Sequence, residues 1–116
     1  MVKKVALVAL NGEPMCFVHV LLNALDMKEK GYEVKVVIEG SATKLVNELN
    51  DEAKPFGRMY LEVKAAGMID CVCKACAMKM GALEGAKTQG LSLRGEMKGH
   101  PSLAGYLEEG YEIITF

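Results

Sequence analysis

A strand, a helix and a second strand are predicted in immediate succession near the start of the chain, and this constrains the fold most. Lys4 to Leu10 is a near-continuous apolar run, which is typical of a strand buried on both faces of a parallel sheet. Pro14 suits the first turn of a helix, and Gly31 suits a helix end. Val34 to Ile38 is a second apolar run, rich in β-branched residues. Because the connections are short, parallel pairing with a right-handed crossover is expected.

The rest of the chain continues this alternation. Helices are predicted at residues 41–49, 59–66 and 74–80, a strand at 68–73, a less regular glycine-bearing stretch at 85–99 with a short strand near 91–93, and a last strand at 111–116. Pro101 is expected to open a final helix that turns Leu103, Tyr106 and Leu107 inward. The 116 residues thus predict a single α/β domain over residues 1–116, a three-layer sandwich with a mostly parallel sheet and helices on both faces.

Charge and hydropathy exclude several classes of partner. The net charge is −1, and neither a basic excess nor a run of like charges indicates binding to nucleic acid or to an anionic membrane. The first apolar stretch is too short for a signal peptide, and no stretch approaches the roughly 18 apolar residues of a membrane span. A cytoplasmic protein is expected. Four cysteines in that compartment favour redox chemistry, sulfur chemistry or metal binding over disulfides.

The predicted third strand ends in a cluster of cysteines. Cys71 and Cys73 share one face of that strand, and Cys73 is expected to be its last residue or the N-cap of the next helix. Free N–H groups at a helix N-terminus, together with the charge of Lys74, favour a thiolate with a lowered pKa. Cys76 follows one helical turn later, which is the spacing of a dithiol redox pair. Cys16 lies in the loop after the first strand, and this loop and the turn at Cys73 are expected to meet beyond the carboxyl ends of the strands, where ligands of such sheets bind.

Three interpretations of the cysteines are open. The first is a reactive thiolate on Cys73, with Cys76 or Cys16 as a resolving partner. The second is a metal site of Cys71, Cys73 and Cys76 with Cys16 or His19, which ranks lower because four-thiolate sites usually come from two CxxC pairs. The third is a set of small buried hydrophobic residues. A structural role is favoured for Cys71 and a functional role for Cys73, and both remain open for Cys16 and Cys76.

Other polar residues carry weaker signals. Glu13 lies in the predicted cleft but is more typical of a solvated loop carboxylate, and a structural role is favoured for His19. His100, before Pro101, is interpreted as a helix cap. Gly12 stands alone, whereas a phosphate-binding loop needs several glycines at set spacing. No dinucleotide or other cofactor is therefore expected.

Several segments together resemble one protein family. The string from Val72 to Gly81 places Val-Cys before a helical stretch and then a glycine. The Gly31–Val34 turn into the second strand and the closing 109–113 strand extend the likeness over nearly the whole chain. These segments resemble the DsrE/DsrF-like proteins.

The resemblance implies a small cytoplasmic α/β protein that forms homo- or hetero-oligomers. Better understood family members carry persulfide sulfur in relays, on a cysteine that matches Cys73 here. A sulfur-relay or sulfurtransferase-like protein is therefore predicted, with a sulfur donor or acceptor protein as its partner and a homo-oligomeric state. Whether it acts as an enzyme is left open.

The chain also departs from the family pattern. Cys71 and Cys76 flank Cys73, the cysteine that matches the relay position. Relatives often have other residues in place of these flanking cysteines. Extra thiols beside a persulfide favour release of the sulfur with formation of a disulfide. The alternatives are dithiol redox chemistry, a non-catalytic module that binds zinc or iron, and an oligomeric protein that binds a small ligand and whose cysteines are incidental.

Overall fold

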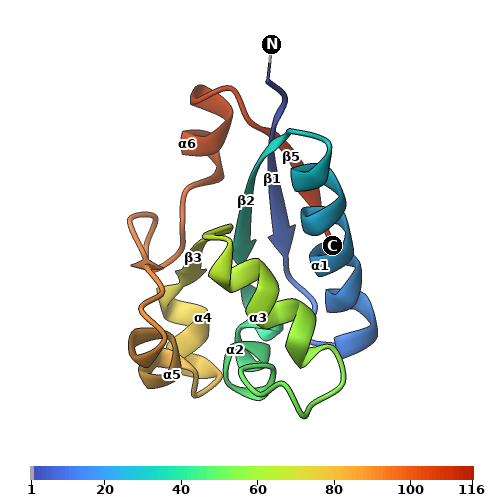
Figure 1. Ribbon diagram of the computed structural model, residues 1–116. Helices are drawn as coiled ribbons and strands as arrows, with labels where there is room; N and C mark the ends of the chain where they lie inside the picture. Colours follow the sequence, from blue (N-terminus) through green and yellow to red (C-terminus); the bar gives the residue numbers. More distant parts are fainter. Residues whose placement is uncertain (1) are drawn as a thin grey trace.

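Five parallel strands form one sheet in the order β4-β3-β2-β1-β5 in the computed structural model, which describes residues 2–116 (Figure 1). The strands are β1 (Lys4–Ala9), β2 (Glu33–Ile38), β3 (Ile69–Cys73), β4 (Leu93–Arg94) and β5 (Glu112–Thr115). The strand–helix–strand unit at the start of the chain is present as predicted, with β1 and β2 paired in parallel along their whole length.

The helices cover the two faces of the sheet unequally. They are α1 (Pro14–Glu29), the 3-10 helix η1 (Gly40–Lys44), α2 (Leu45–Glu48), α3 (Gly57–Ala65), α4 (Lys74–Lys79), α5 (Leu83–Thr88) and α6 (Leu103–Glu108). From β1 to β4 the chain steps in one direction along the sheet, so right-handed crossovers place α1 to α5 on one face. The return from β4 to β5 runs the other way and places α6 on the opposite face. The predicted three-layer α/β architecture is confirmed.

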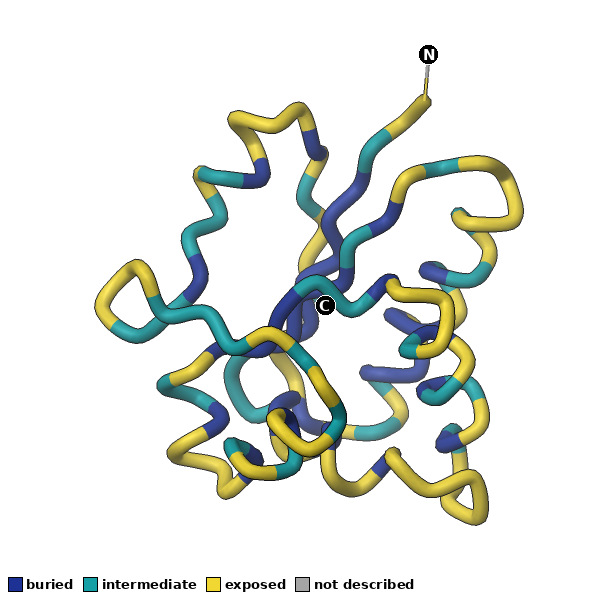
Figure 2. The backbone as a smooth tube through the Cα atoms, turned by 60° about the vertical axis from the view of Figure 1, so that its left-hand side comes forward, coloured by how far each residue is buried: buried dark blue, intermediate teal, exposed yellow. Residues whose placement is uncertain are grey.

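Two apolar cores follow from this arrangement. The larger core packs β1, β2 and β3 against α1 to α5 and contains the fully buried Phe17 and Tyr60. The smaller core lies under α6, where Cys71 packs with Tyr106 and Tyr111. The two tyrosine rings meet edge to face at 6.2 Å between centroids. Figure 2 shows the buried residues concentrated along the central strands.

The structure corrects four details of the sequence prediction. Helix α5 was not predicted, and β4 is Leu93–Arg94 instead of 91–93. The last helix begins at Leu103, two residues after Pro101. Leu107 is 59% exposed instead of facing inward, because a six-residue helix lying on one sheet face buries only one side, which Tyr106 occupies. Within residues 2–116, no helix is both long and apolar enough to cross a membrane.

Candidate functional site

Cys73 is the last residue of β3 and the N-cap of α4, as predicted. It is completely buried, with 0% exposure. Its Sγ lies 3.1 Å from Nδ1 of His100 and 3.6 Å from the carbonyl oxygen of Gly99. The thiol is therefore covered by a segment that comes from a distant part of the chain.

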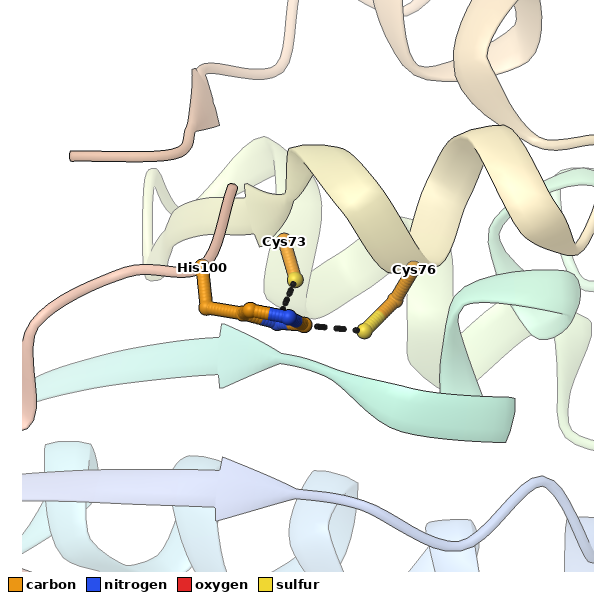
Figure 3. Close-up of side chains that lie close together, drawn as sticks. All are labelled: Cys73, Cys76 and His100. Atoms are coloured by element: carbon orange, nitrogen blue, oxygen red, sulfur yellow. Dashed lines mark hydrogen bonds between the residues drawn. The ribbon is translucent and has the colours of Figure 1, made fainter. Parts of the chain in front are cut away.

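The covering segment consists of residues 95–100 and is held by backbone hydrogen bonds. Met97 and His100 exchange N–H···O bonds of 2.8 and 3.0 Å. The N–H of Ala75, in the first turn of α4, donates to the Gly99 carbonyl at 2.9 Å. These bonds fix the imidazole of His100 over the start of α4 (Figure 3).

Gly99 allows the covering segment to approach α4 closely. Its φ is +97°, and a Cβ at this position would lie 2.9 Å from the Cβ of Ala75. Gly99→Ala is expected to lower the free energy of unfolding by about 1–2 kcal/mol or more, because left-handed backbone is costly for residues with a Cβ. Gly105→Ala is the matched control, since nothing lies within 4 Å of its added Cβ in α6. That change is expected to raise stability by up to about 1 kcal/mol.

Urea unfolding of both variants checks this pair of expectations. Equal stability of Gly99→Ala and the unchanged protein would contradict the close packing of residues 95–100 on α4. Alkylation of Cys73 under native conditions is also expected to be faster in Gly99→Ala than in the unchanged protein, because the segment that covers the thiol is displaced.

Cys76 brings a second thiol to the same imidazole. It lies one turn into α4, is partly exposed, and places its Sγ 3.7 Å from Nδ1 of His100. The carbonyl of Cys76 accepts a 3.2 Å hydrogen bond from the Thr43 hydroxyl, which ties α4 to η1. Figure 3 shows the imidazole between the two thiols.

Electrostatics at Cys73 differ from the sequence prediction. Burial, and then the neighbouring Cys76 thiol, raise the pKa of Cys73 to about 12. This direction is opposite to the lowered pKa that the sequence predicted from the helix N-terminus and Lys74. The physical reason is that the thiol is fully buried, whereas α4 has only six residues and Lys74 is exposed. Cys73 is therefore a protonated thiol in the free protein.

A protonated Cys73 determines how the hydrogen bond to His100 runs. The S–H donates, and Nδ1 accepts when the ring proton is on Nε2. An imidazole in this position can take the thiol proton as the sulfur begins to react. The cluster is thus a buried thiol with a base in contact and a second thiol within reach.

Cys71 has the structural environment expected for it. It is fully buried in the smaller core, and its Sγ lies 3.3 Å from the Tyr106 hydroxyl. Burial raises the pKa of Cys71 to about 11. The Tyr106 hydroxyl donates to Asp70 at 2.5 Å and accepts from Arg94 at 3.0 Å. These contacts satisfy the polar groups under α6 and give Cys71 the buried, hydrogen-bonded environment of a structural residue.

Comparison with known proteins identifies the family. A model of the DsrE/DsrF-like family matches residues 4–116, which is nearly the whole chain. The chain belongs to the DsrE/DsrF-like family. An uncharacterised protein of Methanocaldococcus jannaschii is 40% identical over 96 residues, covering 83% of this chain and 76% of the relative. A shorter uncharacterised protein of Archaeoglobus fulgidus is 44% identical over 43 residues, covering 37% of this chain and 70% of that protein.

A solved structure supports the fold assignment. A conserved protein of unknown function from Bacteroides thetaiotaomicron superposes with a TM-score of 0.68 at 22% identity, covering 96% of this chain and 94% of that one. At that identity the likeness shows the fold alone. The family membership and the fold thus agree with what the sequence predicted.

Cys16 does not join the cysteine cluster of this DsrE/DsrF-like protein. It lies on α1 and lines an open pocket of about 430 Å³ with His19, Asn23 and Phe116. Phe116 follows β5, and both β1 and β2 separate β5 from β3 in the sheet. Of the two resolving partners considered for Cys73, the structure brings only Cys76 to it.

The loop after β1 lines a pocket that is separate from the cysteine cluster. Glu13 and its neighbours in this loop line an open pocket of about 370 Å³ together with Ser41, Lys44 and Glu48. Neither β3 nor α4 contributes to its lining. The two segments that were expected to meet at the carboxyl edge of the sheet therefore form different sites.

His100 is the candidate site residue that sequence reasoning missed. It was interpreted as a helix cap, but α6 starts after Ser102, and the His100 ring contacts the two cysteines instead. A usable signal was present in Gly95 and Gly99, two glycines that flank a short turn just before this histidine. Glu39, directly after β2, also lies near this cluster: burial raises the pKa of its carboxyl, and a protonated His100 would oppose that rise.

Proposed function

We propose that this protein is a sulfur-relay protein in which Cys73 carries a persulfide. Membership of the DsrE/DsrF-like family supports a sulfur-relay type of role. The single observation that carries the proposal is the 3.1 Å contact between the Cys73 thiol and the His100 imidazole. This contact supplies a base to the one cysteine that matches the relay position.

Loading of Cys73 is a transfer between two sulfurs without net oxidation. Nδ1 of His100 takes the thiol proton, and Sγ of Cys73 attacks the outer sulfur of a donor persulfide. A new S–S bond forms on Cys73, the S–S bond of the donor breaks, and the donor leaves as a thiolate. The imidazolium then protonates that leaving thiolate, so His100 returns to its starting state.

Cys76 is the resolving thiol in this proposal. Its sulfur lies within 4.8 Å of the Cys73 sulfur, and thiol–disulfide chemistry proceeds by attack of one sulfur on another. Attack of Cys76 on Sγ of the Cys73 persulfide forms a Cys73–Cys76 disulfide and releases the outer sulfur as sulfide. Two thiol groups of a cytoplasmic thiol reductant then restore both cysteine thiols by exchange and are themselves oxidised to a disulfide; the cytoplasm is the compartment proposed from the sequence.

Access to Cys73 requires a partner and a movement. The thiol is covered by residues 95–100, so part of this segment must shift, with the His100 ring still beside Sγ, before a donor sulfur reaches it. Met97 in the segment and Met78 on α4 are 53% and 61% exposed, and flexible apolar side chains of this kind suit protein–protein contact. A donor or acceptor protein is therefore the proposed partner, and self-association of the chain is part of the same proposal.

Intact mass spectrometry after incubation with a small-molecule persulfide donor tests the function. The reduced, metal-free protein is expected to gain one sulfur at early times, which a reductant removes, and Cys76→Ser, which lacks the resolving thiol, is expected to retain it. Cys73→Ser is expected to gain none. Cys16→Ser is the matched control and is expected to load like the unchanged protein, because Cys16 lies outside the cluster.

Two results would contradict the sulfur-relay proposal. One is the absence of any mass gain in Cys76→Ser under conditions in which a small thiol is loaded by the same donor, and it would favour a protein whose cysteines are incidental to a binding function. The other is an equal gain in Cys73→Ser, which would show that the sulfur sits elsewhere.

A further inference from the structure

The three side chains at this site also form an arrangement that suits a metal ion. The Sγ atoms of Cys73 and Cys76 and Nδ1 of His100 all lie within 4.8 Å of one another. We propose that they bind one zinc ion, and that the bound ion excludes sulfur from Cys73. The second half of this inference rests on the proposed sulfur-relay function, whereas the first half does not.

The spacing of the ligand atoms fits tetrahedral zinc. With Zn–S near 2.3 Å and Zn–N near 2.0–2.1 Å, tetrahedral angles place sulfur and nitrogen about 3.6 Å apart and two sulfurs about 3.8 Å apart. The observed sulfur-to-Nδ1 distances are 3.1 and 3.7 Å. Cys73 therefore has to move about half an ångström away from Nδ1, and the two sulfurs, which lie within 4.8 Å of each other, have to approach by no more than about 1 Å.

The ligand types select the metal. Two thiolates and an imidazole suit a borderline-soft ion such as zinc, whereas magnesium and calcium prefer oxygen ligands. Binding displaces the two thiol protons to solvent, and the imidazole stays neutral with its proton on Nε2. Two thiolate charges then balance the charge of the ion, so the buried site remains neutral and avoids the cost of an isolated buried charge.

The backbone holds the ligands in place before an ion binds. Cys73 ends a strand in the middle of the sheet between β2 and β4, and Cys76 follows one turn later on α4, which is bonded to η1 through Thr43. His100 is fixed by the bond between the Ala75 N–H and the Gly99 carbonyl. Little ordering is therefore needed on binding, in contrast to zinc sites that form only when the chain folds.

Three protein ligands leave a fourth position open. Cys76 and His100 are partly exposed, so water or a group from a partner can fill this position. A zinc-bound Cys73 thiolate has its lone pair engaged and lacks the contact with Nδ1 that loading uses. Zinc and sulfur therefore compete for the same atom, which makes metal occupancy a switch for the relay.

Zinc binding is tested on the metal-free protein by competition with a chromophoric chelator, and its geometry by titration with cobalt(II). One zinc per chain is expected, with the intense visible bands of tetrahedral cobalt and a thiolate-to-metal absorption. Cys76→Ser and His100→Ala are each expected to weaken zinc binding by at least about 100-fold, since loss of even an outer partner costs 10–100-fold. Circular dichroism of the metal-free variants confirms that they are folded.

His19→Ala is the matched control for the ligand histidine. His19 is the other histidine of the chain and lies on α1 in a different pocket, so this variant is expected to bind zinc like the unchanged protein. No saturable one-to-one binding, or binding that survives both Cys76→Ser and His100→Ala, would overturn the metal site.

The switch is tested by sulfur loading with and without one equivalent of zinc. Zinc is expected to abolish the mass gain, and a chelator is expected to restore it. Unchanged loading of the zinc-bound protein would overturn the exclusion of sulfur. Failure of the metal-free protein to load would instead remove the proposed sulfur-relay function, while the zinc titration would still decide the metal site by itself.

Discussion

His100→Ala is expected to slow sulfur loading of Cys73 by about 10²- to 10⁴-fold, the usual contribution of a positioned general base. The reason is that Cys73 holds its proton in the folded protein, because burial raises its pKa to about 12. A thiol of that kind reacts only when a base in contact removes the proton. Nδ1 of His100 lies 3.1 Å from Sγ and meets this requirement.

The rate of mass gain under a fixed concentration of persulfide donor measures the effect. His19→Ala is the matched control and is expected to load at the unchanged rate, since His19 lies on α1 away from the cluster. The loss in His100→Ala is expected to shrink as the pH rises, because hydroxide and buffer then replace the missing base. An equal loss at every pH would indicate that His100 only holds the covering segment in place.

Free imidazole offers a further distinction between these two roles of His100. If the ring acts as a base, added imidazole is expected to restore part of the loading rate in His100→Ala, because the deleted ring leaves space beside Cys73. A purely structural ring would not be replaced by a free one. Loading of His100→Ala at the unchanged rate would contradict the base altogether.

Local sequence patterns predicted most of the fold because its strands and first helix have strong periodicity. The β1–α1–β2 unit follows from apolar runs with proline and glycine at the helix ends. Helix α5 was missed because Gly85 disfavours a helix when it is considered alone. The structure explains this glycine by tertiary packing, since a Cβ at Gly85 would lie 1.6 Å from the side-chain oxygen of Asn47.

The sequence predicted the part of the candidate site that lies in one local segment, but it did not predict the part that depends on tertiary packing. Strand alternation and the helix after it placed Cys73 and Cys76 correctly, because both lie within one local segment. His100 reaches them through the close approach of Gly99 to Ala75, and the glycines before His100 indicate a tight turn but not which element that turn contacts. The direction of the Cys73 pKa was also missed, because the helix terminus is visible in the sequence whereas complete burial of the thiol is not.

Alkylation of Cys73 in the reduced, metal-free protein is expected to be slower at neutral pH than alkylation of an ordinary cysteine, and slower still in His100→Ala, which lacks the assisting base. The thiolate is the reacting form, and a pKa raised from 9.0 to about 12 lowers its fraction about tenfold for each of three units. In His100→Ala the rate is expected to rise about tenfold per pH unit, without a plateau through pH 10. Iodoacetamide labelling with peptide mass mapping measures this, with the urea-unfolded chain as reference.

Cys76→Ser separates the two causes of the raised pKa. Burial is the larger cause and the Cys76 thiol the second, so this variant is expected to alkylate faster at Cys73 while remaining far slower than the unfolded chain. Cys16→Ser is expected to leave the rate unchanged. A plateau in the rate of His100→Ala near neutral pH would contradict a protonated thiol, because it would mean that Cys73 ionises there without a base in contact. The base would then have no proton left to remove, and the loss of loading expected in His100→Ala would need another cause.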